Sequence, residues 1–91
     1  MRELVLYARP GCHLCVESRA TIEAILAERG TRGLEPIALV ERDISMDPAW
    51  EQAFFAEIPV VEVGDRRLTL ATSPGRLRRF LDEALGAAVA G

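Results

Sequence analysis

The chain has 91 residues, of which 49% are hydrophobic and 27% charged, a balance typical of a folded globular domain rather than a disordered chain. The net charge of −3 argues against nucleic-acid binding, which needs a concentrated basic face. No stretch approaches the roughly 18 apolar residues of a membrane span, and the first residues lack the apolar core of a secretory signal. The sequence therefore predicts a single cytoplasmic domain over residues 1–91, ordered over about 3–86, with neither membrane nor nucleic acid as a partner.

Two apolar runs and a long periodic segment make up the first half of the chain. Residues 4–8 are apolar and end just before Pro10-Gly11, which predicts a buried strand. From Cys12 to Arg29 apolar side chains recur every three or four residues, which predicts an amphipathic helix with Gly30 just beyond its end. Four further residues are expected to widen the buried stripe of this helix: Val16, Ala20, Ala24 and Ala27. Residues 36–44 hold four consecutive apolar side chains, a pattern typical of a strand buried on both faces of a parallel sheet.

The second half begins with a short helix, for which Asp47 and Pro48 suit the N-cap and first helical positions. One face of this helix is expected to pack in the core together with the next aromatic residue: Trp50, Ala53, Phe54 and Phe55. Residues 58–63 and 66–70 are predicted to be strands joined by a tight turn at Gly64-Asp65. Ser73-Pro74 predicts the start of a last helix that is apolar at helical spacing up to Leu85, with Gly86 as its stop and a fraying tail over 87–91.

The order of these elements predicts an α/β fold. A strand–helix–strand unit requires a right-handed crossover and therefore a parallel pair of strands, whereas the hairpin adds an antiparallel pair. The prediction is a four-stranded mixed sheet with helices on both faces, in the order β-α-β-α-β-β-α.

Two cysteines, Cys12 and Cys15, are spaced as CxxC and lie where the first predicted strand gives way to the first helix. Free N–H groups and the positive dipole end of a helix stabilise a thiolate, so we expect Cys12 to have a lowered pKa and to act as the nucleophile. Cys15 lies one turn further along the core-facing stripe and is expected to be the buried, resolving thiol. Arg9 would add a positive charge near Cys12, and His13 is either a donor beside the thiolate or an exposed imidazole.

A metal site is the rival interpretation of the cysteine pair. Zinc usually takes four ligands, and beyond the two cysteines the chain offers only His13, whose neighbouring position directs it away from them. No metal is therefore predicted within one chain. A metal or iron–sulfur cluster shared by two chains, a protein-binding module without turnover, and a pair of inert buried thiols stay open as alternatives.

The segment from Tyr7 to Cys15 resembles the active-site segment of the glutaredoxin family, in the thioredoxin superfamily. In that family the first strand ends in an aromatic residue, a basic residue lies three before the first cysteine, and a CxxC opens the helix. The His-Leu filling of the CxxC is similar to that of a bacterial glutaredoxin-like subgroup, and residues 57–60 resemble the segment with the family's cis-proline. The likeness spans Leu4 to about Leu85 and implies a thioredoxin-like fold, a cis Pro59 against the sulfurs, and an Ile58 backbone that pairs with an extended substrate.

Two segments depart from the glutaredoxins that use glutathione. Those proteins hold glutathione with a Gly-Gly turn and acidic residues after the last strand, where this chain has residues 70–75 with no acid. The threonine that usually precedes the proline segment is replaced by Glu57. Thr72 and Ser73, with the free N–H groups of the last helix, form a candidate anion-binding corner, while Arg78 and Arg79 are expected to be solvated.

Together these features predict a dithiol thiol–disulfide oxidoreductase in which Cys12 attacks and Cys15 resolves. No bound cofactor is expected, and glutathione or another low-molecular-weight thiol is left open as co-substrate. The expected partner is a disulfide-containing protein or a small thiol, the electron donor is left open, and the chain is expected to be a monomer.

Overall fold

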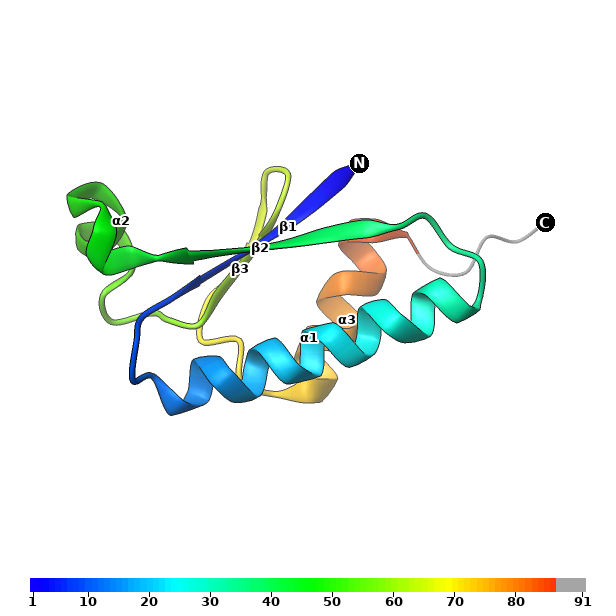
Figure 1. Cartoon of the computed structure of the whole chain (residues 1–91), viewed down its shortest axis with the longest axis horizontal. Helices are drawn as coiled ribbons and strands as arrows, with labels where there is room; N and C mark the ends of the chain where they lie inside the picture. Colours follow the sequence, from blue (N-terminus) through cyan, green and yellow to red (C-terminus); the bar gives the residue numbers. More distant parts are fainter. Residues whose placement is uncertain (87–91) are drawn as a thin grey trace.

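The computed structural model describes residues 1–86 of the chain, and its elements follow the predicted order (Figure 1). Four strands, three α-helices and one 3₁₀ turn occur in that part of the chain, in the order β1 (Arg2–Ala8), α1 (His13–Thr31), β2 (Ile37–Asp43), η1 (Ile44–Met46), α2 (Pro48–Phe54), β3 (Val60–Val63), β4 (Arg66–Leu68) and α3 (Pro74–Leu85). No helix in the described residues is both long enough and apolar enough to span a bilayer.

The sheet has the strand order β2-β1-β3-β4. Strand β1 runs parallel to β2, with Leu4 opposite Leu39, and antiparallel to β3, with Leu6 opposite Val61. β1 is therefore an inner strand, and its last five residues are buried. The prediction that residues 36–44 form a strand buried on both faces is wrong, because β2 lies at an edge of the sheet and its apolar side chains are only half-buried.

Alternate residues of β1 contact two different cores, because successive side chains of a strand point to opposite faces. Leu4, Leu6 and Ala8 belong to the larger core, which α1 and α3 cover, and Figure 1 shows these two helices on the same side of the sheet. Val5 and Tyr7 belong to a smaller core with η1 and α2. The Tyr7 ring packs against Phe54 with centroids 4.5 Å apart. The predicted sheet with helices on both faces is confirmed, with two helices on one side and one short helix on the other.

Helix α1 differs from its prediction in its end and in the width of its buried stripe. It passes through Gly30 and ends at Thr31, and Gly33, at φ +75°, follows its C-cap. The C-terminal role given to Gly30 belongs to Gly33, whose N–H donates to the Gly30 carbonyl at 3.0 Å. The buried residues of α1 are Cys15, Ser18, Ile22, Ile25 and Arg29, and Leu26 is half-buried against the same core. The four residues expected to widen the buried stripe are all exposed: Val16, Ala20, Ala24 and Ala27.

Smaller differences from the predictions concern the burial of α2 residues and the bounds of β3 and β4. In α2, Asp47 caps the helix by accepting from the Ala49 N–H at 2.8 Å, as predicted, but Ala53 and Phe55 are exposed and only Phe54 is fully in the core. Strand β3 starts two residues later than expected, after the Ile58–Pro59 pair, and β4 ends at Leu68. The predicted tail over 87–91 lies outside the described residues.

Candidate active site

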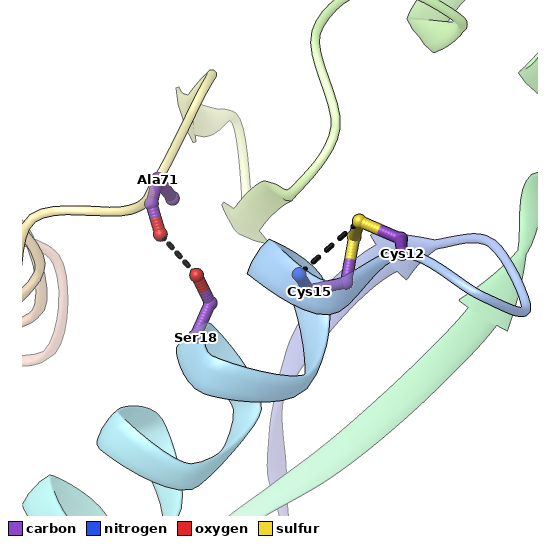
Figure 2. Close-up of a disulfide and its surroundings, with 4 residues drawn as sticks. All are labelled: Cys12, Cys15, Ser18 and Ala71. Carbon is purple, nitrogen blue, oxygen red and sulfur yellow. Dashed lines mark hydrogen bonds between the residues drawn. A yellow bond between two sulfur atoms is a disulfide. The ribbon is translucent and has the colours of Figure 1, made fainter.

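Cys12 is the N-cap residue of α1 and is joined to Cys15 by a disulfide, with their Cα atoms 5.2 Å apart. A tight turn leads into it, because the Cys12 N–H donates to the Arg9 carbonyl at 3.1 Å and Gly11 has φ +83°. The Cys12 sulfur accepts from the Cys15 N–H at 3.1 Å, as an N-cap side chain does (Figure 2). The predicted position of the pair at the start of the helix is confirmed.

The two sulfurs have different surroundings. Cys15 is 4% exposed and belongs to the larger core, whereas Cys12 is half-buried and packs at the edge of that core. An incoming sulfur therefore has access to Cys12 before Cys15. At the same end of the helix the unpaired N–H groups and the helix dipole favour negative charge.

The Ile58–Pro59 peptide bond is cis, as the resemblance implied. Pro59 is buried, and its carbonyl accepts from the Ala71 N–H at 2.8 Å. The N–H and C=O of Ile58 make no backbone hydrogen bond to any residue in the 1–86 part of the chain. Ile58 packs against the same core as Cys12 and Cys15, so its free backbone groups lie in the neighbourhood of the disulfide.

The segment from Leu70 to Thr72 is fixed to the site by hydrogen bonds. The Leu70 N–H donates to the Glu57 carbonyl at 2.8 Å, and the Thr72 N–H donates to the Leu70 carbonyl at 2.8 Å. The buried hydroxyl of Ser18 donates to the Ala71 carbonyl at 2.5 Å, which ties this segment to α1 one turn after Cys15 (Figure 2). The loop before α3 is thereby attached both to the cysteine-bearing helix and to the proline segment.

Arg9 forms an ion pair with Glu51 of α2. The second oxygen of that carboxylate, Glu51 Oε2, is buried and accepts no hydrogen bond from residues 1–86. The positive charge expected beside Cys12 is therefore shared with a carboxylate from the other side of the sheet.

Of the other predicted supporting residues, His13 and Ser73 each bind a group of their own helix. His13 is 84% exposed, and its Nε2 lies 2.8 Å from Glu17 Oε2 one turn along α1. Ser73 is the N-cap of α3, and its hydroxyl accepts from the Arg76 N–H at 3.3 Å. Thr72 is exposed beside it. The hydroxyl of Ser73, one of the predicted anion donors, thus already serves as the cap of its own helix.

A cleft of about 400 Å³ opens beside the disulfide, between the turn before α1 and the end of β2. Both cysteines line it together with charged side chains of both signs, which are Arg9, Arg19, Glu41 and Asp43. Arg19 and Glu41 are paired across it at 2.9 Å. Within residues 1–86 no three His, Cys, Asp or Glu side chains gather as the ligands of a metal would.

Comparison with known families assigns nearly the whole chain to one family. Residues 3–85 match the family described as Glutaredoxin-like domain (DUF836). The chain belongs to the glutaredoxin-like domain family. A comparison with curated proteins found no match.

Solved structures agree with this assignment. Structural-genomics target protein XcR50 from X. campestris is similar with 29% identity and a TM-score of 0.66, over 89% of this chain and 97% of that one. A malarial protein (15% identity, TM-score 0.63, 91% and 96% of the two chains) and the germline-specific thioredoxin Deadhead from Drosophila melanogaster (14%, 0.60, 89% and 78%) share the fold. The thioredoxin-like fold predicted from the sequence is confirmed.

Three residues of this glutaredoxin-like site escaped the sequence interpretation. The position of Ser18 could have predicted its role. It lies three residues after Cys15 on the core-facing stripe, where a buried polar side chain needs a hydrogen-bond partner. Nothing in the sequence around Leu70 predicts its role, because its backbone conformation is set by the hydrogen bonds of the folded loop. Nothing in the sequence around Glu51 predicts its role either, because its ion pair with Arg9 joins residues 42 positions apart.

Proposed function

We propose that this glutaredoxin-like protein is a dithiol thiol–disulfide oxidoreductase. The observation that carries the proposal is the pairing of a half-buried Cys12 sulfur, at a helix N-terminus, with a Cys15 that is buried in the core. A thiolate at Cys12 gains hydrogen bonds and the helix dipole, and CxxC thiols at such positions have pKa values of roughly 3.5–7.5 against about 8.5 for a free cysteine.

The reaction runs in two exchanges. In the reduced protein the Cys12 thiolate attacks one sulfur of a substrate disulfide, forms a mixed disulfide, and releases the other sulfur as a thiolate, which takes a proton. Cys15 then loses its proton and attacks the Cys12 sulfur, which forms the Cys12–Cys15 bond and releases the second substrate thiol. Two electrons have moved from the two protein sulfurs to the substrate; Cys15 supplies one of the two protons on the substrate thiols, and the solvent supplies the other.

The free N–H and C=O of Ile58 support an extended polypeptide as substrate, since two such groups can pair with one residue of a strand. Glutathione or another low-molecular-weight thiol is the proposed source of electrons or an alternative substrate. We place the reaction in the cytoplasm, where thiol pools keep such a dithiol reduced, and we propose that the protein works as a monomer without a bound cofactor.

Alkylation of the reduced protein tests the assignment of the two roles. Iodoacetamide at neutral pH is expected to modify Cys12 much faster than Cys15, as followed by mass spectrometry of the digested protein. Equal rates at the two sulfurs contradict the assignment.

A trapping experiment identifies the partner. The Cys15→Ser variant lacks the resolving thiol and is expected to accumulate a mixed disulfide at Cys12 in cell extract, whereas the matched Cys12→Ser variant is expected to trap nothing. Glutathione, another small thiol or a protein on the trap distinguishes the proposed partners. An empty trap, together with metal or cluster absorbance in anaerobically purified protein, favours a binding module without turnover.

A further inference from the structure

Leu70 is the one residue other than glycine with a positive φ, +48°, among residues 1–86. A side chain with a β-carbon in this left-handed region costs about 1–2 kcal/mol, and glycine or asparagine fits it better. The Leu70 side chain is also 51% exposed, so it forgoes much of the burial that stabilises a leucine. Neither the backbone nor the core of this protein benefits from leucine at this position.

The backbone around Leu70 is nevertheless held in place. The N–H groups of Leu70 and Ala71 bond to the carbonyls of Glu57 and Pro59, the two residues that flank Ile58. Leu70 therefore lies beside the short stretch of backbone whose hydrogen-bonding groups are free. Ala71 belongs to the same core cluster as Cys15, with Cys12 and Ile58 packed against it, so the backbone of Leu70 lies beside Ile58 at the edge of this core, with a half-exposed side chain.

Two apolar side chains near the dithiol are at least partly exposed. Leu14, between the two cysteines, is 50% exposed, and Ile58 is half-buried. Residues 68–75 carry no charged side chain, so the segment offers no ion pair to the carboxylates or the amine of a charged small thiol. The free backbone of Ile58 and the apolar side chain of Leu70 together match an extended chain with an apolar side chain next to its cysteine.

We propose that Leu70 is a specificity-determining residue that contacts an apolar side chain of a polypeptide disulfide substrate. This inference rests on the proposed dithiol function and adds the substrate class. The contact explains why a conformationally unfavourable leucine is held, by four hydrogen bonds of the loop, at the edge of the site.

The test measures how fast the pre-reduced protein is oxidised by three disulfides. Two are extended peptides that differ only in having leucine or serine next to the disulfide cysteine, and the third is bis(2-hydroxyethyl) disulfide. We expect the Leu70→Gly and Leu70→Asn variants to lose about tenfold in rate constant with the leucine peptide. Their rates with the serine peptide and the small disulfide should stay at the wild-type level. Leu70→Met, which keeps an apolar side chain, should retain most of the preference.

Stability separates a specificity role from a structural one. Both Leu70→Gly and Leu70→Asn are expected to unfold in urea at the same concentration as the wild-type protein or at a higher one, because they relieve the left-handed backbone. An equal loss of rate with all three disulfides, or no loss with any, overturns the proposal while leaving the dithiol function intact. Failure of the wild-type protein to react with any of the three overturns both.

Discussion

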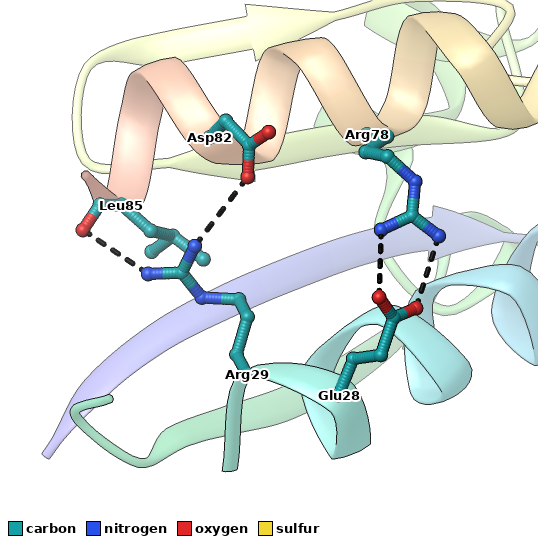
Figure 3. A network of polar contacts seen from close by, with 5 residues as sticks. All are labelled: Glu28, Arg29, Arg78, Asp82 and Leu85. Atoms are coloured by element: carbon teal, nitrogen blue, oxygen red, sulfur yellow. Dashed lines mark hydrogen bonds and ion pairs between the residues drawn. The ribbon is translucent and has the colours of Figure 1, made fainter. Parts of the chain in front are cut away.

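The two ends of α1 differ in what their polar groups contact. At the N-terminal end Cys12 caps the helix with a half-buried sulfur, and Leu14 is exposed beside it. At the C-terminal end Glu28 and Arg29 both bind α3 (Figure 3). One end keeps a reactive group accessible, whereas the other joins two helices, so substitutions at the two ends should separate function from stability.

The C-terminal end itself contains two unlike contacts. Arg78 binds Glu28 with both terminal nitrogens, at 3.2 and 3.0 Å, in an exposed position. Arg29 is 4% exposed, yet its Nη2 is 3.4 Å from the Leu85 carbonyl and its Nη1 is 3.6 Å from Asp82. The Nε and Nη1 atoms of Arg29 make no hydrogen bond to the described residues. The better geometry belongs to the exposed pair, so the packing of the Arg29 stem, rather than its charge, should hold this end of the helix.

The largest effect is expected from Cys12→Ser, at the accessible end. Serine is not a nucleophile at neutral pH without an activating base, so exchange should fall to the background rate. The N-cap should survive, because serine is a preferred N-cap residue. Urea unfolding of the reduced proteins is expected to differ by no more than about 0.5 kcal/mol. A large loss of stability in the reduced state would mean that Cys12 also supports the fold.

Arg29 at the other end should show the reverse pattern, with a large effect on stability and none on exchange. Arg29→Ala removes a buried stem, leaves a cavity and deprives the Leu85 carbonyl of its donor, at a cost of roughly 2–4 kcal/mol. Arg29→Met keeps most of the volume and removes a charge with unsatisfied nitrogens, so it should cost about 1 kcal/mol or less. Urea unfolding measures both variants. Equal losses in the two would show that the guanidinium, and not its stem, stabilises the contact.

The two ends of α1 also differ in how much of their structure the sequence predicts. The accessible end depends on local signals. The CxxC and the Pro10-Gly11 turn are enough to predict a dithiol at the start of α1, and the apolar run from Ile58 predicts a strand whose start is two residues early. The other end depends on partners distant in sequence. Arg29 ends the periodic segment that predicts the helix, but nothing local indicates its position beside Leu85, 56 residues away.

The remaining misses have the same physical origin. Gly30 and Gly33 are both plausible C-terminal signals, and in the folded chain Arg29 is buried in the last turn and the helix continues through Gly30 to Thr31. The apolar run of β2 predicts burial on both faces, but strand order is a property of the whole sheet and places β2 at the edge. Phe55 is apolar and next to a core residue, yet it caps α2 and is exposed.

A moderate effect is expected at Ser18, which links the accessible end to the loop before α3. Ser18→Ala leaves the buried Ala71 carbonyl without its side-chain donor, at a cost of about 1–2 kcal/mol. Because the loop is attached to α1 by this hydroxyl, hydrogen exchange at the Leu70 and Ala71 amides should become faster than in the wild-type protein.

The matched control for Ser18 is Ser45→Ala, at an exposed hydroxyl bonded to Asp43, which should change stability by no more than about 0.5 kcal/mol. If Ser18→Ala behaves like Ser45→Ala in both stability and amide exchange, the hydroxyl does not hold the loop.

The smallest effect is expected from the exposed pair at the C-terminal end. The hydrogen bond from Arg78 holds the pKa of Glu28 below its ordinary value of 4.5, and the positive charges of Arg78 and Arg32 add to this. A carboxyl with a lowered pKa in the folded state stabilises the protein above its unfolded-state pKa, and this contribution disappears as the pH falls through the folded-state pKa. Glu28→Gln should therefore lower the melting temperature slightly at neutral pH and not at all in acid.

A double-mutant cycle of Glu28→Gln and Arg78→Gln isolates this pair from other charges. The coupling should shrink in high salt, because exposed ion pairs are screened. If the coupling at neutral pH exceeds the difference between Arg29→Ala and Arg29→Met, then the charged pair, and not the buried stem, is the main link between α1 and α3, and the contrast between the two contacts is wrong.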